Sequence, residues 1–383
     1  MTKPKTVVPL HEPEFKGNER KYALECLDTG WVSSGGPFVT RFEREAAARL
    51  GAREGVATVN GTAALHLALR AAGVGYGDEV LVPSITFIAT ANAAVYQGAV
   101  PRFVDSETES MGMDPVKLEA WLEKNTRRAG KRLVERKSGR RIAACVPVHV
   151  FGHPARIVEL AAVCARYGIA MIEDAAESLG SSYRGRACGS FGLVGCLSFN
   201  GNKVLTTGGG GMVVGSDAKF IGRVRHLSTQ AKKDASVYLH DEVGYNYRMP
   251  NINAALGCAQ LEGLDSALAR KRASAERYRA GLAGARGVSL IWEPEGARSN
   301  FWLNTVRCDG PVRARRLLRR LNDAGYEARP LWTPCHRQPM FENLSAGPLD
   351  TADALWRTCF NIPSSAALPA RAVDAVCALL RKP

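Results

Sequence analysis

The sequence predicts an α/β protein: a large domain with a mostly parallel sheet, followed by a smaller C-terminal α+β domain. Three observations predict it. The chain has 383 residues, which is long enough for two domains. Short apolar runs alternate with helical stretches as far as Ala175, a pattern typical of right-handed βαβ crossovers and a sheet covered on both faces. After about residue 250 the pattern of predicted strands and helices changes.

The elements of the large domain follow in a regular order. An extended arm leads to helices predicted over 17–30 and 38–51, the second after the turn Ser34-Gly35-Gly36-Pro37. The alternating region then predicts strands over 55–60, 78–84, 100–105, 141–150 and 169–175, and helices over 61–73, 86–98, 115–124 and 155–168.

The C-terminal part mixes helices and strands in another way. A long basic helical segment over 254–283 leads to two apolar runs, the helix "VRARRLLRRLNDAG" and the stretch "YEARPLW". We therefore expect an N-terminal arm and large domain over 1–253 and a small domain over 254–383.

The composition is that of an ordinary soluble globular protein, with 46% hydrophobic and 23% charged residues. No run of 18 apolar residues predicts a membrane span. The opening "MTKPKTVVPLHEPEF" has prolines and acids where a signal peptide is apolar, so we expect a cytoplasmic protein. The ten cysteines are scattered without a CxxC pair or a zinc-ligand spacing, which favours buried free thiols and no metal.

The net charge of +14 raises nucleic acids and anionic ligands as partners. The segment Arg127 to Arg141, "RRAGKRLVERKSGRR", holds eight basic residues and one acid, and we interpret it as a solvated insertion between a helix and a strand. The stretches "ARKRASAERYRAG" and "PVRARRLLRRL" are interpreted as helices with basic outer faces. No DNA-binding module is recognisable, so we expect no nucleic-acid partner.

Three stretches contain candidate functional side chains in loops that follow strands, which is where parallel sheets bind their ligands. In "TVNGTAALHLAL", Gly61 and Thr62 open a helix, and this start is either an anion site or a simple N-cap. Asp174 ends an apolar strand, and it either holds a proton on a heterocyclic nitrogen or caps a helix. Lys203 stands alone in a long run without other charges. It lacks the P-loop spacing, and it is either a nucleophilic amine or a side chain that reaches solvent from a strand edge.

Together the three stretches form an ordered set. A phosphate-binding turn, an acid at a strand end and a lysine about thirty residues later are the contacts that pyridoxal phosphate requires. At this point the chain resembles the pyridoxal phosphate-dependent nucleotide-sugar aminotransferases of the DegT–StrS family, which have the aspartate-aminotransferase fold. The stretches that carry the resemblance are "TGWVSSGGPFVTRFE", "ATVNGTAALHLAL", "PSITFIATANAAVYQGAVPRFVD", "VHVFGHPARI", "EDAAESLGS", "SFNGNKVLTTGGGGM", "GYNYRMPNINAALG", "SNFWLN" and "HRQPMF".

The resemblance implies a role for each matching residue. Lys203 would form the Schiff base with the cofactor and then shuttle the proton, and Asp174 would pair with the pyridinium nitrogen. Glu177 would lie near the phenolic oxygen of the ring. The remaining cofactor contacts would be the phosphate ligands Gly61, Thr62 and Ser198 and the ring neighbour Phe87.

The resemblance also implies a homodimer with shared active sites. Asn246 and Arg248 match residues that reach the neighbouring subunit's site, where Arg248 suits a carboxylate or a phosphate. His336 matches a histidine near the sugar nucleotide, although a histidine in a surface loop is the alternative.

The reaction implied is amino transfer, because relatives that deoxygenate their sugar replace the lysine with histidine. The opening "PLHEPEFKGNE", the stretch "DTGWVSS" and the inserted basic segment resemble a subgroup that aminates C4 of UDP-4-keto-6-deoxy-N-acetylhexosamines with L-glutamate as donor, for bacterial surface sugars. A sugar-nucleotide dehydratase and a non-catalytic regulatory or nucleic-acid-binding protein on the same fold are the alternatives.

Overall fold

The computed structural model describes residues 7–234 and 236–382, so residues 1–6 of the predicted arm lie outside it. The largest sheet has seven strands in the order β1-β11-β10-β7-β6-β2-β3. All neighbours within β10-β7-β6-β2-β3 are parallel, and only β11 runs antiparallel to its neighbours. The strands are β1 (Glu54–Thr58), β2 (Glu79–Pro83), β3 (Val100–Val104), β6 (Ile142–Cys145), β7 (Ala170–Asp174), β10 (Val194–Ser198) and β11 (Gly211–Gly215). The predicted fold class is confirmed.

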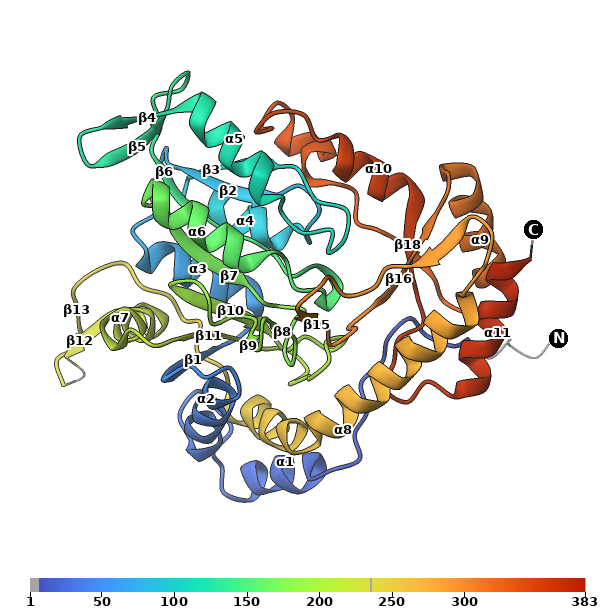
Figure 1. Cartoon of the computed structure of the whole chain (residues 1–383). Helices are drawn as coiled ribbons and strands as arrows, with labels where there is room; N and C mark the ends of the chain where they lie inside the picture. Colours follow the sequence, from blue (N-terminus) through green and yellow to red (C-terminus); the bar gives the residue numbers. More distant parts are fainter. Residues whose placement is uncertain (1–6, 235, 383) are drawn as a thin grey trace.

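Helices cover both faces of this sheet, because neighbouring strand residues point to opposite sides (Figure 1). In β2, Val80 and Val82 pack with α3, α4 and α7, whereas Leu81 packs with α5 and α6. The helices α2 and α8 cover the part of that second face near β1 and β11. These helices are α2 (Pro37–Arg49), α3 (Gly61–Ala71), α4 (Ala89–Val95), α5 (Pro115–Asn125), α6 (Ile157–Tyr167), α7 (Ala218–Ser228) and α8 (Asn251–Leu282).

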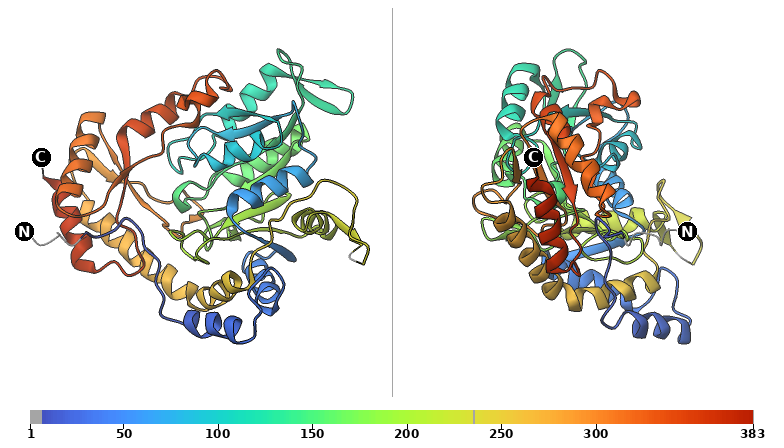
Figure 2. Two further views of the ribbon diagram at one scale, coloured as in Figure 1. Left: turned by 180° about the vertical axis from the view of Figure 1, so that it is seen from behind. Right: turned by 90° about the vertical axis from the view of Figure 1, so that its right-hand side faces the viewer.

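The C-terminal part forms a four-stranded antiparallel sheet in the order β14-β16-β18-β17. Its core joins this sheet to α9, α11 and the last turns of α8 through Tyr278 and Leu282. Figure 2 shows α8 running from the large sheet to this smaller layer. The elements are β14 (Val288–Leu290), β16 (Asn304–Cys308), α9 (Pro311–Asp323), β17 (Arg329–Pro330), α10 (Asp350–Thr358), β18 (Cys359–Ile362) and α11 (Ala370–Arg381). The boundary predicted at residue 253 falls within the first turn of α8, and the division stays a prediction.

Smaller elements complete the described chain. The basic segment after α5 is a two-stranded hairpin, a structure that its charge pattern alone does not predict. The other elements are α1 (Glu19–Asp28), the hairpin strands β4 (Thr126–Ala129) and β5 (Arg132–Glu135), β8 (Ser182–Tyr183), β9 (Arg186–Ala187), β12 (Lys232–Asp234), β13 (Leu239–His240), β15 (Ala297–Arg298), and 3₁₀ turns at Val150–Gly152, Cys335–Arg337 and Pro339–Phe341.

Two further expectations can be compared with the structure. All ten cysteines are buried free thiols, as predicted. Among the described residues, none of the helices has both the length and the apolar character needed to cross a membrane. The arm is tied to the small sheet, since Val8 donates a backbone hydrogen bond to Gly325 O at 2.8 Å and Ser364 donates one to Leu10 O at 2.7 Å.

Candidate active site

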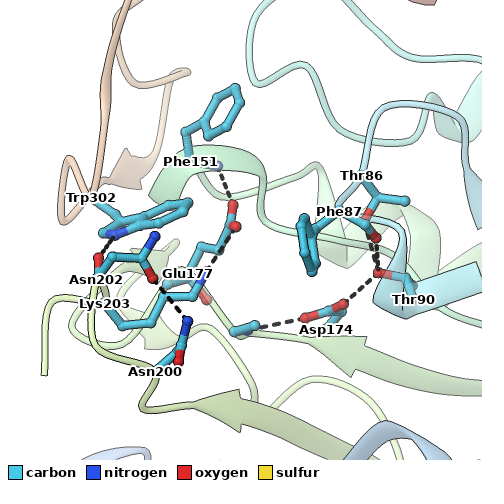
Figure 3. A network of polar contacts seen from close by, with 12 residues as sticks. Thr86, Phe87, Thr90, Phe151, Asp174, Glu177, Asn200, Asn202, Lys203 and Trp302 are labelled. Atoms are coloured by element: carbon cyan, nitrogen blue, oxygen red, sulfur yellow. Dashed lines mark hydrogen bonds and ion pairs between the residues drawn. The ribbon is translucent and has the colours of Figure 1, made fainter. Parts of the chain in front are cut away.

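The predicted lysine, acid and phosphate turn lie around one cavity of about 330 Å³ at the carboxyl ends of the parallel strands. Seven of the predicted residues line it: Gly61, Thr62, Phe87, Asp174, Glu177, Ser198 and Lys203. The structure therefore brings together residues that are up to 142 positions apart in the chain (203 − 61). Figure 3 shows Asp174 at the end of β7 and Glu177 and Lys203 converging on the cavity from the loops after β7 and β10.

The phosphate turn begins at Asn60, which caps α3 by accepting the Ala63 N–H at 2.8 Å. The turn therefore contains a helix N-cap, which Asn60 provides, and Thr62 lines the cavity beside it; phosphate binding at this turn stays a prediction. Gly61 is required by close packing, since a Cβ there would lie 2.8 Å from the Ser198 Cβ. The first turn of α3 thus faces Ser198, and this cradle of N–H groups and hydroxyls suits an anion.

Asp174 is the last residue of β7 and is buried. No helix begins in residues 175–181, which are fully described, so the helix-cap alternative is wrong. Its Oδ2 accepts the Thr90 hydroxyl at 2.7 Å, and its Oδ1 accepts the Ala176 N–H at 3.1 Å. Burial raises the pKa of Asp174, and these two hydrogen bonds and the charge of Lys203 oppose the shift. A buried carboxylate in this place is suited to a cationic partner.

Lys203 lies in the loop between β10 and β11, and its side chain is only 13% exposed. Its Nζ donates to Glu177 Oε1 at 3.1 Å and lies 3.7 Å from the centre of the Trp302 ring. Burial raises the pKa of Glu177, while the Lys203 ammonium and the N–H of Phe151 at 2.8 Å oppose the shift. The amine is therefore held inside the cavity, and the alternative of a lysine that reaches solvent from a strand edge is wrong.

The glycines after Lys203 let the chain return into the sheet. A Cβ at Gly211, the first residue of β11, would clash with the backbone of Asn60. The close approach fixes the Lys203 loop against the start of α3.

Three predicted residues lie outside the cavity of this chain. Arg248 is held by Glu43, with Nη1 2.7 Å from Oε1, and Asn246 is exposed. His336 Nδ1 lies 2.6 Å from Ser84 Oγ, and its Nε2 lies 3.3 Å from Asp353 Oδ1. Their contacts with substrate, or with a neighbouring subunit's cofactor, stay predictions.

The sequence analysis missed Thr90, Trp302 and Trp332, which also line the cavity. Thr90 lies in the first turn of α4, three residues after Phe87, and its hydroxyl contacts the Phe87 carbonyl oxygen at 3.3 Å. Trp302 comes from the small-domain side through the quoted stretch "SNFWLN". Its indole N–H donates to Asn202 O at 2.6 Å, so it contacts the lysine loop as well as the lysine.

These residues fit pyridoxal phosphate. The anion cradle, the buried Asp174 carboxylate and the Lys203 amine are the three different groups that its phosphate, ring nitrogen and aldehyde require. Phe87 and Trp332 add aromatic faces, with ring centres 6.1 Å apart.

Comparisons with known proteins agree with this site. The model of the DegT/DnrJ/EryC1/StrS aminotransferase family matches residues 13–381, and the chain belongs to that family. EpsN of Bacillus subtilis is 41% identical, over 87% of this chain and 83% of EpsN. The GDP-perosamine synthase of Caulobacter vibrioides is 39% identical over 97% of each chain. Among solved structures, the aminotransferase TlmJ of Streptoalloteichus hindustanus superposes with a TM-score of 0.88 at 29% identity, over 98% of each chain.

DesV of S. venezuelae, solved with a ketimine intermediate, superposes with a TM-score of 0.85 at 31% identity, covering 95% of this chain and 93% of DesV. The protein is thus a pyridoxal phosphate-dependent sugar aminotransferase.

Proposed function

We propose that the enzyme moves the amino group of L-glutamate to C4 of a UDP-linked 4-keto-6-deoxy-N-acetylhexosamine. The observation that carries amino transfer is the position of Lys203, whose amine shares one cavity with Asp174 and the anion cradle. The choice of sugar rests on the subgroup that the N-terminal stretches resemble. The net charge of +14 suits a doubly negative nucleotide sugar and an acidic donor.

Each residue of the cavity has a separate role in the proposed reaction. Bound pyridoxal phosphate supplies an electron sink for the negative charge that develops at the donor's α carbon. Asp174 holds a proton at the ring nitrogen, and Thr90 orients its carboxylate. Lys203 takes the proton from the donor's α carbon as a general base and, as a general acid, would deliver it to the cofactor carbon that carries the transferred nitrogen. Glu177, 3.1 Å away, holds the amine when it is free.

We further propose that the enzyme acts as a homodimer. Phe87 is 54% exposed at the cavity, and Trp31 and Tyr96 are 56% and 58% exposed; in the proposed dimer the second subunit would cover these three aromatic side chains. In that dimer, Asn246 and Arg248 would serve the second subunit's cavity, and Arg248 would leave Glu43 to bind a substrate anion.

A GDP-linked sugar is the second candidate. Besides the Caulobacter enzyme, the GDP-perosamine synthase of Escherichia coli O157:H7 is 36% identical over 97% of this chain. Lys203 disfavours the dehydratase and the non-catalytic alternatives, since neither explains a lysine held between a carboxylate and an indole face.

The first experiment records the visible spectrum of the purified holoenzyme before and after L-glutamate. Bleaching of the cofactor band is expected, and a band insensitive to glutamate would show that the donor is wrong. UDP- and GDP-linked 4-keto-6-deoxy sugars are then compared as acceptors by kcat/KM, with NMR to locate the new amine. A higher kcat/KM for the GDP-linked sugar, or an amine at C3, would contradict the proposed acceptor.

A further inference from the structure

A second cavity, of about 1020 Å³, lies against β3, the edge strand of the large sheet. Its walls come from α5, β3, the turn after β5 and the loop before α10. Figure 1 shows α5 beside the β4–β5 hairpin at this end of the molecule. Among the described residues, it shares no lining residue with the Lys203 cavity. We call it the edge cavity.

Three cations without partners line the edge cavity: Lys124, Lys137 and Arg140. Within residues 7–234 and 236–382, their side chains make no hydrogen bond or ion pair, and all three are exposed. Lys124 stands in the last turn of α5, and the other two belong to the basic segment that the sequence singles out. That segment therefore places two of its charges at a concave site.

The turn that carries Lys137 and Arg140 is ordered by hydrogen bonds. The buried carboxylate of Glu135 accepts the Lys137 N–H at 3.0 Å and the Ser138 N–H. The Ser138 hydroxyl donates to Glu79 at 3.0 Å, which ties the turn to β2. The two cations thus project from a fixed backbone, which lowers the entropy lost when a ligand binds.

The acids of the edge cavity do not cancel these charges. Asp105 is neutralised by the Nζ of Lys117 at 2.5 Å. The oxygens of Glu135 are occupied by the backbone donors of its own turn. Neutral N–H donors do not remove the charge of Glu135, so Glu135 and Asp350 remain against the three unpaired cations. The cavity therefore keeps a net positive charge, which favours an anion.

A flat aromatic ring adjoins the cations. Trp121 lines the edge cavity one helical turn before Lys124, and Asn125 donates to the Trp121 carbonyl at 2.9 Å, which leaves its own side-chain oxygen as an acceptor. A ring for stacking, an amide for a base edge and three cations for phosphates match a nucleotide. We propose that the edge cavity binds a nucleoside diphosphate, free or attached to a sugar, as a site separate from that of amino transfer.

The test is calorimetric titration of the holoenzyme with UDP and GDP. Lys137→Ala/Arg140→Ala should weaken binding at one site about tenfold or more, and added salt should weaken that site in the wild type. The matched control is Lys131→Ala/Arg132→Ala, which removes the same charge from the same basic segment but outside the cavity. Any nucleotide that binds near Lys203 contributes the same heat in the wild type and in every variant. The difference between their isotherms therefore reports binding at the edge cavity alone.

Each outcome bears on the proposal. Identical isotherms for the wild type and both double variants would overturn it, as would equal weakening in the control. Inorganic pyrophosphate bound as tightly as UDP would contradict the contact between a base and Trp121. Trp121→Ala should instead weaken UDP about tenfold and leave pyrophosphate unchanged. If UDP-N-acetylglucosamine binds the edge cavity more tightly than UDP, the ligand is the sugar nucleotide. If UDP binds more tightly, the ligand is the free nucleotide. The titration is independent of Lys203, so it separates this proposal from the proposed reaction.

Discussion

Two lysines contact Trp302, one at its ring and the other at its backbone oxygen, and their surroundings differ. Lys203 faces the cavity, with Glu177 Oε1 at 3.1 Å and the Trp302 ring centre at 3.7 Å. Lys271 of α8 is 1% exposed and donates to the backbone oxygens of Trp302, at 3.1 Å, and Ser364. Within residues 7–234 and 236–382, it has no carboxylate partner.

Burial alone therefore does not identify a catalytic lysine. Burial without a counter-charge lowers the pKa of Lys271 to about 7, and its amine serves only to join α8 to two backbone segments. Lys203 has both a counter-charge and free volume beside its amine. A reacting lysine needs these two features, because its amine must be held when free and must reach another molecule when it reacts.

The largest expected effect tests this distinction directly. Lys203→Ala should lower turnover by about four orders of magnitude, since it removes both the nucleophile and the proton carrier. Lys271→Met, which removes a more deeply buried amine outside the cavity, should retain turnover within about tenfold. Initial rates of 2-oxoglutarate formation measure both. Comparable losses in the two folded variants would show that the cavity does not distinguish the lysines.

The two carboxylates near Lys203 should differ in a similar way. Asp174→Asn leaves no charge to hold a proton at the ring nitrogen, and we expect kcat to fall about a thousandfold. Glu177→Gln keeps an oxygen for the Phe151 N–H and an amide near Lys203, and a loss of about tenfold is expected. Single-turnover rates with L-glutamate separate these effects from acceptor binding. If Glu177→Gln lowered the rate more than Asp174→Asn, then Glu177 rather than Asp174 would be the acid that holds the proton at the ring nitrogen.

The same comparison shows what the sequence could predict. Lys203 stands alone in an uncharged run, so its pattern points to chemistry, and Asp174 and Gly61 follow apolar strands. Lys271 stands among arginines in a stretch predicted to have a basic outer face, and for Lys271 that prediction is wrong. The position of Lys271 on α8 brings its side chain against residues 302 and 364, whose backbone oxygens accept hydrogen bonds from its amine.

Contacts between distant segments account for the other omissions. The alternating pattern predicted five strands of the large sheet but not β10 and β11. Gly195 interrupts the apolar run of β10, and the apolar run of β11 is only Met212-Val213-Val214 between two glycines. Trp302 reaches the cavity from the segment between β15 and β16, far along the chain from Lys203. Periodicity within one element carries no signal for such a contact. Arg248 pairs with Glu43 across 205 positions, which local sequence equally leaves undetermined.

A smaller effect concerns stability and its dependence on pH. The folded protein loses the Lys271 proton near pH 7, whereas the unfolded chain keeps it to about pH 10.5. Between these values the unfolded state binds more protons, so the free energy of unfolding rises with pH. The Lys271 contribution from pH 7 to about pH 9.5 is roughly 3 kcal/mol.

Urea unfolding at the two pH values should show this rise in the wild type, and Lys271→Met should lack it. Lys219→Met, at an exposed position of α7, is the control and should keep the rise. An equal pH dependence in Lys271→Met would mean that the amine stays protonated when folded, and the contrast with Lys203 would then lose its electrostatic basis.

The smallest effect tests the residue that both lysines contact. Trp302→Phe removes the indole N–H that donates to Asn202 O at 2.6 Å and reduces the ring face under Lys203. We expect turnover to fall about tenfold. The pH dependence assigned to Lys271 should persist, because Lys271 contacts only the backbone oxygen of residue 302. If the substitution abolished that pH dependence as well, the two lysines would share one environment through Trp302, and their separate roles would have to be abandoned.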